Sequence, residues 1–194
     1  MFDMNKTLLL ASIACLFSLQ ANADDTLLTH DFGDAKLYIG TDYNSTNAEL
    51  NDGYDNIVAD NYISGSLNVG IKFNQYLGIE GFFQKSNEES SLDSYLKTSF
   101  YAYGTDLLFY TPLNKKTNFL VSTGIAKYKV EAKLKYAGLS INDSESGIGT
   151  RVGLGLEYNI DKNWSIRAIG RYVMLNLDSV ENIKELSLGI RYYF

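Results

Sequence analysis

The chain has 194 residues, a formal net charge of −6 and 45% hydrophobic residues. Its mean hydropathy of −0.14 argues against a helical membrane protein, and a negative charge without a basic stripe argues against a nucleic-acid binder. This hydropathy does not exclude a β-barrel in a membrane, because strands that alternate apolar and polar residues average to a neutral hydropathy.

The first 23 residues, Met1 to Ala23, are predicted to be a secretory signal peptide. Lys6 supplies the positive start, and residues 7–19 form an apolar run that is too short to span a bilayer as a helix. Ala21-Asn22-Ala23 fits an A-x-A cleavage site. The sequence therefore predicts export and cleavage before Asp24.

The mature chain, residues 24–194, is expected to form a single domain. Lipid attachment at Cys15 is the alternative to signal cleavage, and it is disfavoured because Ser12-Ile13-Ala14 is a poor lipobox. Cys15 is the only cysteine, so cleavage would leave a mature chain without a disulfide, and its stability must come from other interactions.

Eight segments of the mature chain alternate apolar and polar residues with a period of two, which is typical of β-strands with two different faces. They are residues 35–44, 62–73, 76–85, 98–111, 118–131, 147–159, 164–175 and 186–194. Pro112 is expected to end the fourth segment, because proline cannot donate to a strand ladder. Each segment has about the length that a tilted strand needs to cross a bilayer.

The connections between these segments alternate in length. Short turns follow the second, fourth and sixth segments, whereas longer connections cover residues 45–61, 86–97, 132–146 and 176–184. Short periplasmic turns and long external loops are typical of outer-membrane barrels. A soluble β-sandwich has no reason to sort its loops in this way.

Aromatic and apolar residues mark the ends of the segments. Aromatic residues are common in strands in general, but here they gather near the predicted strand ends. This placement favours two girdles of aromatic side chains, one at each membrane–water interface. The outer girdle would hold Tyr43 and Tyr172, and the inner one Phe73, Phe109, Phe119, Tyr158, Trp164, Tyr192 and Phe194. The last segment places Leu186, Leu188, Ile190, Tyr192 and Phe194 on one face and stops at the aromatic residue.

This last segment resembles the closing strand of bacterial outer-membrane β-barrels, where the pattern is read by the barrel-assembly machinery. The eight segments, the hairpin over residues 158–172 and the terminal Arg191-Tyr192-Tyr193-Phe194 resemble the small OmpA/OmpX-type barrels, often called porin-family proteins. The resemblance implies an all-β fold, an eight-stranded antiparallel transmembrane up-and-down β-barrel in the outer membrane of a Gram-negative cell. The five residues of the last segment would be its assembly signal, and outer-membrane lipid and lipopolysaccharide would surround it.

The predicted inward rows are small, polar and charged. An eight-stranded barrel has an interior that side chains just fill, and buried charges must be paired. The inward bases are Lys36, Lys72, Arg151, Arg167, Arg171 and Arg191, and the acids are Asp42, Glu80, Asp106, Glu157 and Glu185. We expect one ion-pair network of Glu80, Asp106, Arg151, Glu157, Arg167, Arg171 and Arg191 that plugs the lumen. A narrow polar conduit or gate is the alternative, and the composition of these rows disfavours a hydrophobic conduit.

Catalysis, metal binding and cofactors have little support in the sequence. His30 is the only histidine, it precedes the first strand, and no cysteine–histidine cluster exists for zinc. Asp52, Asp55 and Asp60 could attract calcium, but their spacing is not that of an EF-hand, and a solvated acidic surface is favoured. The sequence therefore predicts a protein that is not an enzyme and has no cofactor.

The long external loops are the predicted functional surface. Residues 133–141 alternate, so they are expected to extend a hairpin above the membrane and to offer an edge for strand addition by a partner. Two functions stay open. The favoured one is a structural or surface-interaction protein that supports the envelope and binds ligands or surfaces through its loops; the alternative is a narrow porin-like channel for small solutes.

Overall fold

The computed structural model describes residues 35–50, 61–90, 96–136, 139–175 and 180–194. Their strands are β1 (Lys36–Leu50), β2 (Asn61–Lys72), β3 (Leu77–Ser86), β4 (Glu89–Ser90), β5 (Leu96–Pro112), β6 (Thr117–Tyr136), β7 (Leu139–Asn159), β8 (Trp164–Leu175) and β9 (Val180–Tyr193). No helix among these residues is long and apolar enough to span a membrane.

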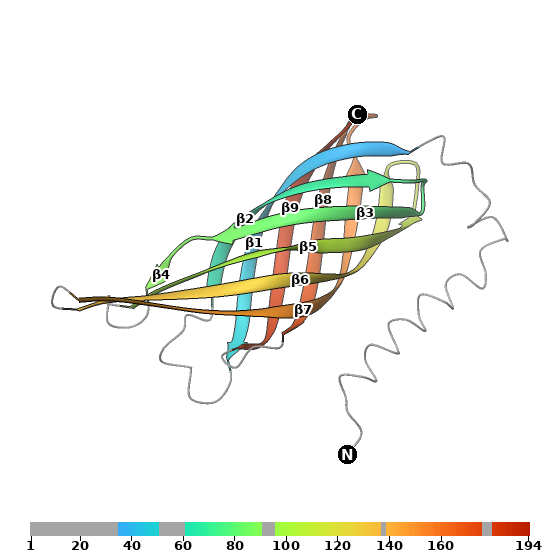
Figure 1. The fold of residues 1–194 in the computed structure, drawn as a ribbon. Coiled ribbons are helices and arrows are strands. Elements are labelled where there is room, and N and C mark those ends of the chain that lie inside the picture. The colour runs from blue at the N-terminus through green and yellow to red at the C-terminus, as the bar shows by residue number, and fades with distance from the viewer. Residues whose placement is uncertain (1–34, 51–60, 91–95, 137–138, 176–179) are drawn as a thin grey trace, which may run out of the picture. The chain divides into compact units, whose positions relative to one another are not determined.

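The strands form one closed antiparallel barrel (Figure 1). Each long strand pairs with its neighbour in the chain, β1 pairs with β9, and β3 pairs with β5, so that only the two-residue β4 stands outside the ring. The predicted eight-stranded up-and-down barrel is therefore confirmed.

Side chains alternate between the inside and the outside of the barrel as the period-two pattern predicted. In β2, every second residue from Tyr62 to Gly70 is buried, while Leu67 between them is 63% exposed. In β9, Ser187 and Arg191 are buried and Leu188 is 58% exposed. The apolar rows face outward because the barrel presents them to its surroundings, and the polar rows fill the interior.

Several strands are longer than the sequence pattern predicted. The segment 132–146, expected to be a loop, is mostly strand, because β6 and β7 remain paired as far as Tyr136 and Leu139. This outcome confirms the expected hairpin extension. Similarly, β1 continues to Leu50, and β9 begins at Val180 instead of residue 186. In these extensions apolar pairs, such as Leu134 with Ile141 and Ala48 with Ile183, alternate with polar pairs, so the ladders continue beyond the expected segments.

The short turns share one pattern of hydrogen bonds between a side chain and the backbone. In each, the side-chain oxygen of the first polar residue accepts hydrogen bonds from the backbone N–H groups two and three positions later, at 2.8 to 2.9 Å. These residues are Asn74, Asn114 and Asp161. Asparagine and aspartate favour such turns, and the donated bonds hold the pKa of Asp161 below its ordinary value.

The predicted signal peptide, Cys15 and His30 lie outside the described residues, as do Asp52, Asp55 and Asp60.

Candidate functional site

The barrel interior holds a cluster of four charged side chains from β1, β3, β8 and β9. A terminal nitrogen of Arg167 lies 2.7 Å from Asp42 and 2.9 Å from Glu80. Arg191 approaches the same Glu80 at 3.1 Å, and the Tyr38 hydroxyl donates a hydrogen bond to it at 2.8 Å. Two acids and two arginines thus balance in a site where each is at most 3% exposed. We call this the Glu80 group.

A second balanced cluster, the Glu185 group, lies between β5, β7, β8 and β9. Arg171 pairs with Glu185 at 2.9 Å, and Arg151 pairs with Asp106 at 3.2 Å. Longer contacts of 3.8 Å from Arg151 to Glu185 and 3.7 Å from Arg171 to Asp106 cross-link the two pairs. Gln84 donates to Glu185 at 2.6 Å, which adds a neutral partner.

Glu157 belongs to neither group. Its ion-pair partner is Lys72 at 3.4 Å, and the Tyr193 hydroxyl donates a hydrogen bond to it at 3.1 Å. Although Glu157 lies opposite Arg167 in the β7–β8 register, the guanidinium of Arg167 reaches across the lumen to β1 and β3 instead.

The expected single network is therefore wrong in its connectivity. All seven predicted residues are buried in the lumen, but the ion pairs among the described residues divide them into three groups. Arg167 and Arg171 are four positions apart on β8, about 13 Å at 3.3 Å per residue, so they bind different carboxylates. The predicted inward Lys36 is exposed at the start of β1, which leaves five acids and five bases in the interior.

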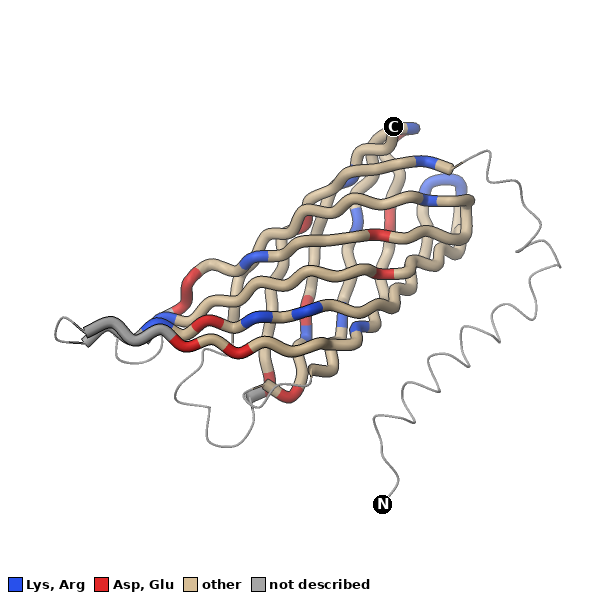
Figure 2. The backbone as a smooth tube through the Cα atoms, viewed as in Figure 1, with Lys and Arg blue, Asp and Glu red and all other residues tan. Residues whose placement is uncertain are grey.

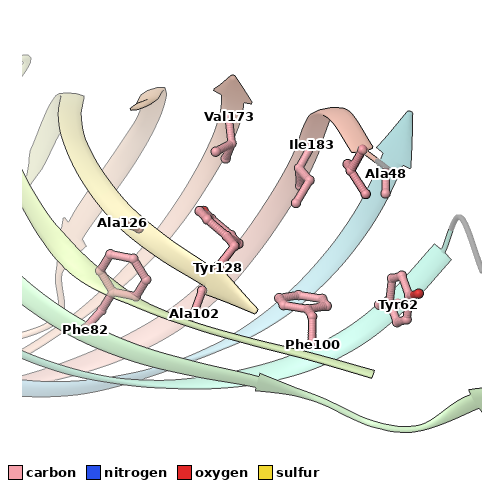
Figure 3. Packing of buried hydrophobic residues seen from close by; sticks show 10 residues of the cluster. Ala48, Tyr62, Phe82, Phe100, Ala102, Ala126, Tyr128, Val173 and Ile183 are labelled. Carbon is pink, nitrogen blue, oxygen red and sulfur yellow. The ribbon is translucent and has the colours of Figure 1, made fainter. Parts of the chain in front are cut away.

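An apolar cluster, which we call the apolar cup, closes the long-loop end of the lumen (Figure 3). It contains Ala48, Tyr62, Phe82, Phe100, Ala102, Ala126, Tyr128, Val173, Val180 and Ile183. Tyr62 and Phe100 meet edge to face with ring centroids 5.3 Å apart. A cavity among these side chains has a volume of about 20 Å³, room for about one water molecule.

Sequence reasoning missed the apolar cup, because it treated the inward rows as small, polar and charged. The signal was present: Tyr62, Phe82 and Phe100 stand in phase with the inward polar residues of their strands. A second cluster of Tyr38, Leu108, Tyr110, Leu120, Ile169 and Tyr193 lies toward the short-turn end. The Glu80 and Glu185 groups thus lie between two layers of apolar and aromatic side chains.

The long-loop end also carries an exposed ion-pair cluster of Glu88, Lys97 and Lys133, which we call the Glu88 clamp. The Glu88 carboxylate, between β3 and β4, accepts hydrogen bonds from Lys133 of β6 at 3.1 Å and from Lys97 of β5 at 3.4 Å. These donors hold the pKa of the Glu88 carboxyl below its ordinary value. On the opposite wall, Glu49 pairs with Lys184 and accepts a hydrogen bond from Asn182, and its pKa is likewise lowered.

We expect the Glu88 clamp to be lost in acid. A depressed pKa in the folded state means that the clamp is present above the ordinary value of 4.5 and disappears as the pH falls through the lowered value. A ¹³C-carboxyl NMR titration should therefore place Glu88 below 4.5. In the variant K97A/K133A its midpoint should rise toward the ordinary value, and an unchanged midpoint there would exclude the two lysines as the cause.

The predicted assembly-signal residues all lie on the outward face of β9 or directly after it. Leu186, Leu188, Ile190 and Phe194 are 58%, 58%, 39% and 68% exposed. The Phe194 N–H donates to the Leu37 carbonyl at 2.9 Å, which continues the β1–β9 seam to the end of the chain. The Tyr192 ring meets Trp164 and Phe194 at 4.9 and 5.2 Å between centroids. Their role in assembly stays a prediction.

Within the part of the chain that the structure describes, no three His, Cys, Asp or Glu side chains are grouped to hold a metal ion. The buried carboxylates Asp42, Glu80, Asp106, Glu157 and Glu185 are each within ion-pair distance of an arginine or lysine. This geometry supports a structural plug, because every acid in the lumen already has a cationic partner.

Comparisons with known proteins agree with this architecture. The family model described as outer membrane protein beta-barrel domain matches residues 8–194, and no curated protein matches the chain. Among solved structures, Ail, the attachment invasion locus protein of Yersinia pestis, is similar at 22% identity and a TM-score of 0.57, over 82% of this chain and 97% of that chain. Neisserial surface protein A is similar at 15% identity and a TM-score of 0.62, with the same coverage. A major outer membrane protein of Thermus thermophilus is similar at 12% identity and a TM-score of 0.61, over 82% and 99%.

Proposed function

Because the chain belongs to the outer membrane protein beta-barrel domain family, we propose that it is an exported envelope protein with a structural and surface-interaction role. Its closed lumen supports the outer membrane, and its extracellular hairpin binds a surface ligand by strand addition. Short periplasmic turns and long external loops give the orientation, so the apolar cup, the Glu88 clamp and the β6–β7 hairpin face outward from the cell.

A free strand edge is the observation that carries this proposal. β7 pairs with β6 along its whole length, but its pairing with β8 starts only at Gly149. Residues 139–148 therefore have no strand on their other side among the described residues, and the hairpin projects beyond the rest of the barrel wall (Figure 1). An open row of backbone N–H and C=O groups is a template for an added strand.

The chemistry of this edge indicates a polar partner with basic residues. Asp143, Ser144 and Ser146 are exposed along β7, and Glu145 is half-buried between them. An extended segment that carries lysine or arginine would satisfy the backbone groups of the edge and complement the exposed carboxylate of Asp143.

The similar proteins supply the first surfaces to test. Ail is named for attachment and invasion, and one of its structures contains the heparin analogue sucrose octasulfate. Epithelial cells and this sulfated sugar are therefore suitable probes for the present chain. They also separate strand addition from anion binding, since a small sugar cannot add a strand.

Breaking the β7 edge should abolish binding to cells. We expect the variant S144P/S146P, and a deletion of residues 134–141, to lose binding of the barrel in nanodiscs to epithelial cells, because proline interrupts the backbone ladder. The control S144A/S146A keeps the backbone and should bind like the wild type. Unchanged binding by the proline variant and by the deletion would contradict strand addition at this edge.

The closed lumen disfavours the alternative of a channel for small solutes. A conducting barrel needs a continuous water-filled path, whereas here the paired charges and the apolar cup occupy the interior in succession. The cup also opposes passage of ions, because apolar constrictions exclude water.

A further inference from the structure

The outward face of β3, β5 and β6 carries a row of lysines at the extracellular end. Lys85 lies beside Tyr101, and Tyr101 lies beside Lys129, as the registers of these three strands show. Lys127 occupies the next outward position of β6, beside Tyr103. Figure 2 shows the basic positions of β3 and β6 on the same side of the barrel. We call Lys85, Lys127 and Lys129 the lysine belt.

The lysine belt has more positive charge than its surroundings neutralise. Lys129 pairs with Glu131 at 3.0 Å and lies over the Tyr101 ring at 5.6 Å. Neither Lys85 nor Lys127 forms a salt bridge with any residue that the structure describes, and both are exposed. This excess of cations is local, because the chain as a whole has a net charge of −6.

The height of the lysine belt places it at the border between hydrocarbon and headgroups. Phe83 lies one outward position below Lys85, Ile125 lies one outward position below Lys127, and Tyr103 lies level with Lys127. These three side chains are 47%, 63% and 48% exposed. Large apolar side chains exposed in this way belong against lipid tails. Lysines at this level and one outward position above it extend their ammonium groups to the level of lipid phosphates.

A groove adjoins the lysine belt on the β2 side. Gly65 lies between Tyr43 and Lys85 in the strand registers, and a Cβ atom built there would meet nothing within 4 Å. The groove has a volume of about 770 Å³, and Ile63, Leu188 and other residues of β1, β2, β3 and β9 line it. It is open and mostly apolar, so it suits a hydrocarbon chain that continues from a headgroup held by Lys85.

We propose that the lysine belt and this groove form a binding site for lipid A, the phosphorylated and acylated glycolipid of the outer leaflet. Lys85 is separated from Lys127 and Lys129 by one strand, about 10 Å at 4.8 Å per strand. That spacing fits two separate phosphate groups on one headgroup better than a single phosphate. One acyl chain of the same lipid lies over Gly65. The inference is independent of ligand binding at the β7 edge.

Native mass spectrometry of the refolded mature barrel in detergent tests the site, with bisphosphorylated lipid A, monophosphorylated lipid A and phosphatidylglycerol as separate probes. Each lysine near an anionic surface contributes about fivefold in affinity. The variant K85Q/K127Q/K129Q should therefore bind bisphosphorylated lipid A about 100-fold more weakly. The control K115Q/K116Q/K162Q removes the same charge at the periplasmic turns and should bind as the wild type does.

The variant G65L tests the acyl-chain part by filling the groove, and it should weaken lipid A binding while the lysines remain. Slower migration on electrophoresis after boiling verifies that each variant is folded. Equal loss in the control variant, unchanged binding by the lysine variant, or equally tight binding of phosphatidylglycerol would overturn the proposal. If G65L changed only the self-association of the barrel, the groove would be a contact between copies and its acyl-chain role would be refuted.

Discussion

Replacing Arg167 with methionine is expected to destabilise the folded barrel by about 3–5 kcal/mol, the cost of breaking a buried ion pair. The guanidinium binds Asp42 at 2.7 Å and Glu80 at 2.9 Å, and all three side chains are buried. Without the Arg167 guanidinium, the carboxylates of Asp42 and Glu80 have only Arg191 as a shared cationic partner. Urea titrations of the barrel in lipid vesicles, followed by tryptophan fluorescence, measure the change in unfolding free energy.

Two further variants show whether charge balance is the cause. R167M/D42N removes one charge of each sign and leaves Arg191 with Glu80, so it should recover part of the lost stability. K97M breaks an exposed ion pair with Glu88 at the rim and should change the unfolding free energy very little. An R167M barrel as stable as the wild type would mean that the Glu80 group does not stabilise the fold.

Replacing Phe100 with alanine is expected to cost about 3–5 kcal/mol, the usual range for a buried phenylalanine. Phe100 is 4% exposed inside the apolar cup, so truncation leaves a cavity that its neighbours only partly fill. The matched control is F83A, whose side chain faces outward and is 47% exposed. At this outward position lipid fills the space left by the ring. Only the free energy of transferring the ring out of water, about 1.5–3 kcal/mol, is therefore lost.

The same variants test the closure of the lumen. The wild-type barrel and F100A should both be silent in planar bilayers, because the ionic groups below the cup still fill the interior. Steady ion conductance by the wild type that changes in R167M would instead establish a conducting lumen and support the channel alternative. Equal destabilisation by F100A and F83A would show that the cup is not packed as a core.

The strands and their faces could be predicted because their signals are local. The bounds of β8, Trp164–Leu175, are those expected, and the inward placement of Arg167 and Arg171 follows from the phase of a single strand. The longer β6 and β7 were underestimated, since their upper parts include many charged and polar residues, such as Lys133 and Asn142, that resemble a loop in composition.

The pairing inside the lumen could not be predicted in the same way. Arg167 and its partner Asp42 are 125 positions apart in the chain, and their contact depends on the reach of a side chain across the closed barrel. The phase of a strand says which residues point inward, but it does not say how far each side chain extends or toward which wall. The apolar cup was missed for a related reason, because its members contribute one ring from each of several strands.

The seam between β1 and β9 has a consequence for how the protein is made. Tyr38 pairs with Tyr193, so the first and last strands of the barrel are neighbours. Until β9 has been synthesised and exported, β1 has an open edge, and every shorter chain is an unfinished sheet with one side available to other polypeptides. Two charges of the lumen, Glu185 and Arg191, are supplied by β9, so Arg171 and Glu80 gain these partners only at this moment. Ring closure therefore removes the open edge and completes the Glu80 and Glu185 groups in one late event, and a chain arrested before β9 would be a substrate for proteases instead of a membrane protein.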